Sequence, residues 1–124
     1  MAADCHCLGS LPSARLLLHR NAALHWFILV PEGAESADLL DLPAPQLATL
    51  MGDAKTVASF LKDELGYPRV NLAALGLVVP QLHLHVVGRR EGDSCWPAPV
   101  WGNLAMQGEY TADQLSALRA ALSL

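Results

Sequence analysis

The stretch Gln81-Leu82-His83-Leu84-His85-Val86-Val87 decides how the rest of the sequence is interpreted. Polar and apolar residues alternate along it, and in a β-strand successive side chains point to opposite faces. Gln81, His83 and His85 therefore share one face, each about 7 Å from the next. The apolar residues between them point the other way, toward a core. The run predicts a strand that presents two imidazoles and one amide.

These residue types suit phosphate chemistry. A neutral imidazole is a good nucleophile near neutral pH, and a second imidazole can donate a hydrogen bond to a phosphate oxygen. The Gln81 amide can donate without a change of charge. Acyl transfer fits less well, since no serine or cysteine lies beside the run. On the pattern alone an inert surface strand is equally compatible. Metal binding would need a third ligand such as His19 or His25.

Three more strands flank this one in the sequence. Residues 15–19 and 25–30 are rich in strand-forming side chains and enclose a plausible turn at residues 21–23, which predicts a hairpin. Residues 69–75 form the next strand, and the motif strand spans residues 82–89. Most connections are short, so we expect a mainly antiparallel sheet in an α+β domain.

Two helices complete the expected elements. Residues 45–65 have helical spacing, with Pro45 at the start and Gly66 at the stop. Thr111 and Gln114 have the spacing of a capping box, which opens a short C-terminal helix. Asp53 and Asp63 lie mostly off the apolar face of the long helix. That face consists of Leu47, Leu50, Met51, Ala54, Val57, Ala58, Leu61 and Leu65.

The composition limits the classes of protein to which the chain can belong. The 124 residues are 52% hydrophobic and 16% charged, which predicts one folded domain over residues 1–124. A net charge of −4 argues against a surface for nucleic-acid polymers. The longest apolar stretch, residues 26–31, is too short to cross a membrane. With no signal peptide at the N-terminus, we expect a cytoplasmic protein.

The cysteines predict no disulfide framework. The chain has three cysteines, Cys5, Cys7 and Cys95, and this odd number suggests reduced thiols. Cys5-His6-Cys7 lacks the spacing of a zinc knuckle. We therefore expect residues 1–12 to form a poorly ordered terminus.

Several segments together resemble the histidine triad (HIT) superfamily, whose signature is His-φ-His-φ-His-φ-φ. The signature is matched by residues 80–90, and the flanking segments 26–31, 71–76 and 96–102 look like the strands and tail of bacterial HIT-like proteins. The resemblance covers nearly the whole chain. It implies a HIT-like fold, with about five strands, one long helix and a short C-terminal helix, in a homodimer.

The resemblance also implies an activity. Members of the family hydrolyse or transfer at the α-phosphate of nucleotide conjugates, such as phosphoramidates and dinucleoside polyphosphates. The middle position of the triad, here His83, attacks phosphorus to give a nucleotidyl-histidine intermediate. The third position, here His85, contacts the phosphate and helps the leaving group. The family needs no metal or other cofactor for this chemistry.

The sequence departs from the family pattern at two positions. The first triad position is Gln81, which can hydrogen-bond but cannot titrate. Leu77 stands where many relatives place a polar residue that faces the phosphate. These changes leave an alternative open, namely a protein that binds or senses nucleotides with little turnover.

Substrate contacts are expected at Asn71, Gly76 and Trp101. Strand pairing for Asn71 and core packing for Trp101 are the structural alternatives. The remaining polar and aromatic candidates are interpreted as follows: Arg89 and Arg90 as a solvated rim or an anion-steering pair, Trp96 as a core or stacking residue, and His19 and His25 as surface residues of the first hairpin.

Overall fold

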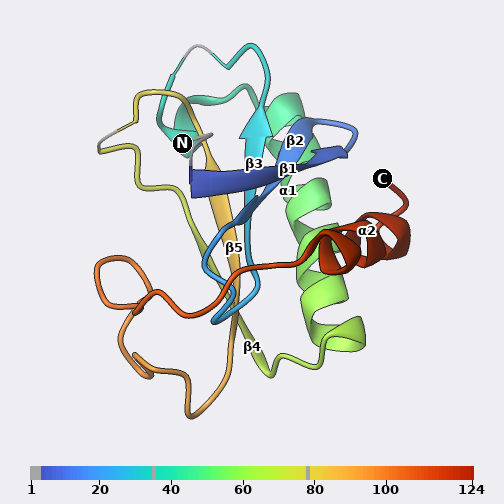
Figure 1. Cartoon of the computed structure of the whole chain (residues 1–124). Helices are drawn as coiled ribbons and strands as arrows, with labels where there is room; N and C mark the ends of the chain where they lie inside the picture. Colours follow the sequence, from blue (N-terminus) through green and yellow to red (C-terminus); the bar gives the residue numbers. More distant parts are fainter. Residues whose placement is uncertain (1–3, 35, 78) are drawn as a thin grey trace.

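The protein is described here by a computed structural model that covers residues 4–34, 36–77 and 79–124 (Figure 1). Five strands form one sheet in the order β1-β2-β3-β5-β4, and every neighbouring pair is antiparallel. The elements are β1 Cys5–Ser10, β2 Ala14–His19, β3 Trp26–Pro31, the short helix η2 Leu39–Asp41, α1 Ala44–Ser59, the π-helical turn η3 Phe60–Glu64, β4 Arg69–Ala73, β5 Leu84–Arg89 and α2 Ala112–Ala121. The predicted α+β class and mainly antiparallel sheet are confirmed.

The long helix covers one face of the sheet (Figure 1). Leu50, Val57 and Leu61 on its inner side are completely buried. They belong to one core with apolar side chains of the two central strands, including Leu84 and Val86 of β5. The predicted helix over residues 45–65 is therefore confirmed, with its last turn wound as η3.

Asp53 departs from the predicted exposed side of this helix, because it is buried. Its carboxylate accepts hydrogen bonds from the backbone N–H of Ser13 at 2.8 Å and from the Ser13 hydroxyl. Buried carboxylates are tolerated when they are hydrogen-bonded in this way. Asp53 thus ties α1 to the turn between β1 and β2.

The prediction of a poorly ordered terminus over residues 1–12 is wrong for residues 5–10, which form β1 at the edge of the sheet. Residues 1–3 of that prediction lie outside the described residues. Cys5 and Leu8 are buried in the core. A bulge between Cys7 and Gly9 interrupts the alternation of faces, so the sequence does not read as a strand. The guanidinium of Arg119, in α2, donates to the carbonyl of Cys7 at 3.0 Å and so ties α2 to β1.

The C-terminal part runs as a long irregular segment from β5 to α2 (Figure 1). The capping box predicted at the start of α2 is present, since the Thr111 hydroxyl accepts from the N–H of Gln114 and the Gln114 side chain accepts from the N–H of Thr111. All three cysteines are free thiols. Among the residues that the structure describes, no helix combines the length and the apolar character needed to cross a membrane.

Candidate active site

The two histidines of the motif lie side by side at the start of β5. The ring centroids of His83 and His85 are 5.0 Å apart and the rings meet edge to face. Leu82 and Leu84 are completely buried on the other side, as the alternation predicts. Gln81 differs from the prediction, because its side chain is exposed in a bend before the strand and does not line the pocket that holds the histidines. Its contribution comes from the backbone.

The backbone carbonyl of Gln81 lies 2.8 Å from Nδ1 of His83. A carbonyl oxygen can only accept a hydrogen bond, so Nδ1 must carry the hydrogen. In the neutral ring, Nε2 then holds the lone pair. The carbonyl thus selects the tautomer in which the nitrogen farther from the backbone is nucleophilic.

His85 has the opposite tautomer. The indole Nε1 of Trp26 donates to its Nδ1 at 2.9 Å, and an indole N–H can only donate. The hydrogen of His85 therefore sits on Nε2. Burial, followed by the charges of His83 and His19, lowers the pKa of His85 to about 4. Near neutral pH the ring is uncharged, with one N–H to donate and its other nitrogen occupied.

His19 is a third imidazole in this pocket, whereas the sequence pattern predicts a surface residue of the first hairpin. It stacks on Trp26 with 4.3 Å between the ring centroids and 13° between the planes. The backbone N–H of Asn21 donates to its Nδ1 at 3.1 Å, so its hydrogen also sits on Nε2. Burial lowers the pKa of His19, opposed in part by the Asp4 carboxylate. The signal for its position is the hairpin register, in which Leu18 pairs with Phe27, so that the adjoining residues His19 and Trp26 come close together.

The pocket that these rings share has a volume of about 190 Å³. A drug-sized ligand usually occupies roughly 300–1,000 Å³, so this pocket accommodates only part of such a molecule. A phosphate group with its immediate neighbours is a suitable size. Its lining comes from the residue before β1, four strands and the segment before β5, and consists of Asp4, Cys5, His19, Trp26, Ile28, Val79, His83 and His85.

Trp101 lies against His85 of the histidine pair. Its ring centroid is 5.3 Å from that of His85 and 6.1 Å from that of Trp26. Its indole Nε1 is buried and has no hydrogen-bond partner within residues 4–34, 36–77 and 79–124. A buried N–H without a partner is costly, by about 1–3 kcal/mol. This donor is therefore unsatisfied among the described residues.

Arg89 has a structural role, and neither interpretation from the sequence anticipated it. Its side chain is 3% exposed and forms an ion pair with Asp93, with 2.8 Å between Nε and Oδ2. It also donates to the Oδ1 of Asn71 at 3.0 Å and to the carbonyl of Ala98 at 2.7 Å. Arg89 thereby fastens the segment after β5 to the sheet. Asn71 is held within this network, which favours its structural alternative.

The other residues singled out from the sequence lie outside the pocket lining. Gly76 has a φ of 65°, and an added Cβ would approach the carbonyl of Ala37 to 3.1 Å. Leu77 is 89% exposed. The Arg90 guanidinium lies over the ring of Tyr67, 5.5 Å from its centroid. Trp96 lies beneath the guanidinium of Arg89 at 5.8 Å.

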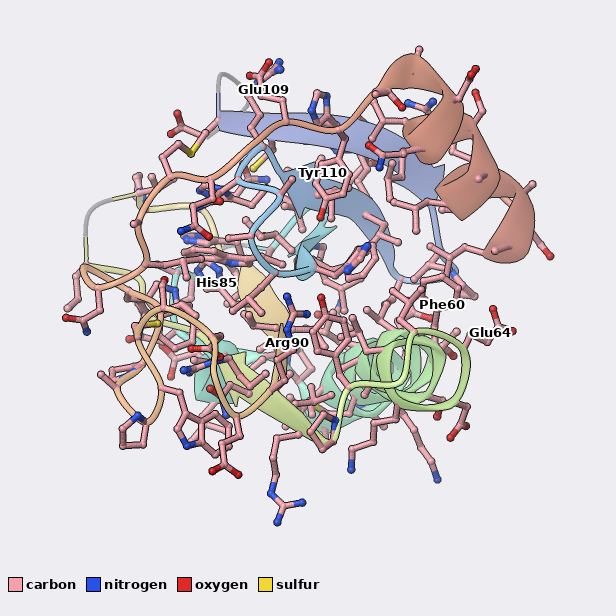
Figure 2. All side chains as sticks on the ribbon, turned by 60° about the horizontal axis from the view of Figure 1, so that its bottom comes forward. Phe60, Glu64, His85, Arg90, Glu109 and Tyr110 are labelled. Carbon is pink, nitrogen blue, oxygen red and sulfur yellow. The ribbon has the colours of Figure 1, made fainter. Side chains whose placement is uncertain are left out.

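A second cavity, of about 430 Å³, lies on another side of the molecule. Figure 2 shows Phe60, Glu64 and Tyr110 around this region, apart from His85. His25 belongs to this cavity, and its Nδ1 is 2.8 Å from the hydroxyl of Tyr67. His25 is thus separated from the histidine pair, and it is not placed to act as a third ligand with them.

The described residues include no cluster of side chains suited to a metal ion. Within residues 4–34, 36–77 and 79–124, no group of three or more His, Cys, Asp or Glu side chains is arranged to hold a metal ion. The Nδ1 atoms of His19, His83 and His85 are all occupied by protein partners. The arrangement instead combines one nucleophilic nitrogen with two N–H donors around a small pocket.

Comparisons with known proteins agree on one family. A family model described as HIT domain matches residues 2–92. A histidine triad protein from Bradyrhizobium japonicum is 36% identical over 98% of this chain and 90% of that chain, with a TM-score of 0.88. One from Marinobacter aquaeolei VT8 is also 36% identical, over 98% and 88%, at 0.88. One from Sinorhizobium meliloti 1021 is 33% identical, over 98% and 89%, at 0.89. No curated protein matches the chain.

Proposed function

The chain belongs to the HIT family, and from that premise we propose that it is a nucleotide-binding hydrolase or nucleotidyl transferase acting at the α-phosphate of nucleotide conjugates. The observation that carries this proposal is the contact between His83 Nδ1 and the Gln81 carbonyl at 2.8 Å. It leaves the lone pair on Nε2, in a pocket with two N–H donors. A nucleophile and oxyanion donors are the parts that phosphoryl transfer requires.

In the proposed reaction, His83 Nε2 attacks the α-phosphorus and displaces the leaving group. A nucleotidyl-histidine forms, and water then releases the nucleoside monophosphate. The Nε2–H of His85 donates to a phosphate oxygen, where negative charge increases in the transition state. Because Trp26 occupies the other nitrogen of His85, this donor is fixed in orientation before the substrate arrives.

The nucleoside lies at the mouth of the pocket in this proposal, since about 190 Å³ holds little more than the phosphate. Trp101 is the proposed contact for that part of the substrate or for the leaving group, through its unpartnered indole N–H. Gly76 remains a proposed backbone contact. Asn71 is the weakest of the three candidates, because Arg89 occupies its carbonyl oxygen.

We also propose that the protein is a homodimer and that it resides in the cytoplasm. β4 is an edge strand, and Leu72 and Leu75 at this edge are 45% and 42% exposed. A second copy that pairs along β4 would cover them. Light scattering should give twice the monomer mass, and Leu72→Glu should give the monomer.

The proposed location in the cytoplasm is supported by the three free thiols, which are consistent with a reducing compartment.

Nucleotide binding without useful turnover is the second candidate. It is favoured by the exposed positions of Gln81 and Leu77, which leave the pocket without a side chain from either of these two sites. Under this alternative, a nucleoside monophosphate raises the melting temperature, while nucleotide conjugates remain intact.

Turnover measurements separate the two candidates. Wild type, His83→Ala and His6→Ala are assayed on diadenosine tetraphosphate, with thermal melting as the check of folding. His6 lies on β1 and does not line the pocket, so its variant is the control for loss of an imidazole. The proposal expects turnover by wild type and His6→Ala, and a loss of at least about 1,000-fold in His83→Ala. Equal rates for all three proteins would refute it.

A further inference from the structure

The hydrogen bonds around the pocket determine which of its groups can release a proton. A general acid must give up a proton and be stable afterwards. His85 holds its only hydrogen on Nε2, because Nδ1 accepts from Trp26. Loss of that hydrogen would leave an imidazole anion, which is not accessible near neutral pH. His85 can therefore donate a hydrogen bond but cannot transfer a proton.

His19 is limited in the same way. Its Nδ1 accepts from the backbone N–H of Asn21, and that donor cannot be turned away without moving the chain. Protonation of the ring would break this hydrogen bond. Burial also lowers the pKa of His19, which disfavours its cationic form. The third ring, His83, is the nucleophile, so its Nε2 is bonded to phosphorus when the leaving group departs.

The two remaining titratable groups in the lining are poor proton donors. Asp4 is exposed at the rim, where its side-chain oxygens serve as hydrogen-bond acceptors. Cys5 is buried, and burial raises the pKa of its thiol, so it retains its proton. The side chain of Trp26 has one N–H, and it already donates to Nδ1 of His85. Within the part of the chain that the structure describes, the lining thus provides hydrogen-bond donors but no group that readily protonates a leaving atom.

On the basis of the proposed function, we infer that this site works without a general acid and therefore acts on nucleotide anhydrides, whose leaving group departs as an anion. Phosphoramidates are disfavoured, because their amine must gain a proton as the P–N bond breaks. The family includes enzymes for both classes, and here the tautomers of His85 and His19 select between them.

The reaction balances without a proton from the protein. The Nε2 lone pair of His83 forms the N–P bond while the P–O bond to the leaving phosphate breaks, and that oxygen keeps the electron pair. Water then adds to phosphorus, and the electron pair of the N–P bond returns to Nε2. The proton lost by the attacking water passes to solvent. His85 and His19 keep their hydrogens throughout.

A matched pair of substrates tests the inference. Adenosine 5′-phosphofluoridate and adenosine 5′-phosphoramidate differ in one small leaving group, which departs as fluoride from the first and needs a proton in the second. Diadenosine tetraphosphate represents the anhydrides. Since a general acid typically contributes about 10²–10⁴-fold, kcat/KM for the phosphoramidate should be at least about 100-fold below the values for the other two. Values within tenfold would overturn the inference while the proposed function stands. If no substrate is turned over, both fail.

A pair of variants gives a second readout. His85→Gln keeps an N–H near the position of Nε2 but cannot titrate, whereas His85→Ala removes the donor. If His85 only donates a hydrogen bond, the glutamine variant should keep phosphofluoridate turnover within about tenfold of wild type, and the alanine variant should lose about 100-fold or more. Melting curves establish that both variants are folded. Equal losses in folded variants would show that an N–H at this position is not sufficient for the role of His85, and would overturn the hydrogen-bond role on which the inference rests.

Discussion

The indole of Trp26 donates to Nδ1 of His85 at 2.9 Å, from the strand next to β5. This contact sets the chemistry of His85, because it fixes the tautomer and favours the uncharged ring. The aromatic residue belongs to the candidate site through its N–H rather than through its size. In the sequence, Trp26 was visible only as a strand residue.

Trp26→Phe keeps a large ring and removes the donor. The buried Nδ1 of His85 then lacks its partner, so the ring can adopt either tautomer and gain a proton more easily. We expect kcat to fall by about 10- to 100-fold and the acid limb of the pH–rate profile to move upward. The profile and imidazole ¹⁵N shifts measure both effects. An unchanged profile would show that the indole does not control His85.

The low pKa of His85 makes stability depend on pH. The folded-state pKa is about 4, against 6.5 for the unperturbed group. Between these values the unfolded chain binds more protons, so stability rises with pH through this window and is lost as pH falls through it. The contribution is fully present above pH 6.5 and amounts to at most about 3 kcal/mol.

Urea unfolding of wild type and His85→Gln at intervals from pH 4 to pH 7 isolates the contribution of His85 to the unfolding free energy. The difference between the two proteins should change with pH across the window, since the pH dependence of the other histidines is common to both. A constant difference would mean that His85 has an ordinary pKa in the folded protein.

The ion pair of Arg89 and Asp93 supports the segment after β5. Hydrogen bonds from Arg89, followed by those from the backbone N–H groups of Cys95 and Arg90, lower the pKa of Asp93 to about 2 against the cost of burial. Asp93→Asn would leave the buried Arg89 cation without its counter-charge. We expect a loss of about 3–5 kcal/mol in unfolding free energy. Asp63→Asn, at an exposed position, is the control and should change stability by less than about 0.5 kcal/mol.

Gly88 in β5 allows Tyr67 to pack on the sheet, where its hydroxyl meets His25. An added Cβ would lie 2.6 Å from the Tyr67 ring. We expect Gly88→Ala to cost about 1–3 kcal/mol through overpacking. Gly52→Ala is the matched control, because nothing lies within 4 Å of its Cβ in α1. It should stabilise the protein by about 0.5–1 kcal/mol. Similar melting temperatures for the two variants would contradict the packing argument.

Local patterns were sufficient to predict the elements that carry the core. Leu82 and Leu84 alternate with the histidines, and Leu50 and Val57 recur at helical spacing, so the motif strand and the long helix could be predicted from the sequence. β1 could not, because the bulge after Cys7 removes the alternation that marks a strand.

The remainder of the site depends on contacts between segments far apart in the chain. His19 enters the pocket only because β2 and β3 pair in a particular register, and Trp26 reaches His85 across the sheet. Arg89 is buried because residues 93–98 fold back on it. The motif identified His83 and His85, but tertiary structure assigned the tautomers on which their roles depend.

Trapping the covalent intermediate shows whether His83 is the nucleophile. Wild type and His83→Ala are mixed with adenosine 5′-phosphofluoridate, quenched with base within milliseconds to seconds because phosphohistidine is labile in acid, and analysed by intact-mass and peptide mass spectrometry. We expect one adenylyl group per chain, located on His83 and absent from the alanine variant. Turnover with no adduct at any quench time, or an adduct on another residue that persists in His83→Ala, would contradict it.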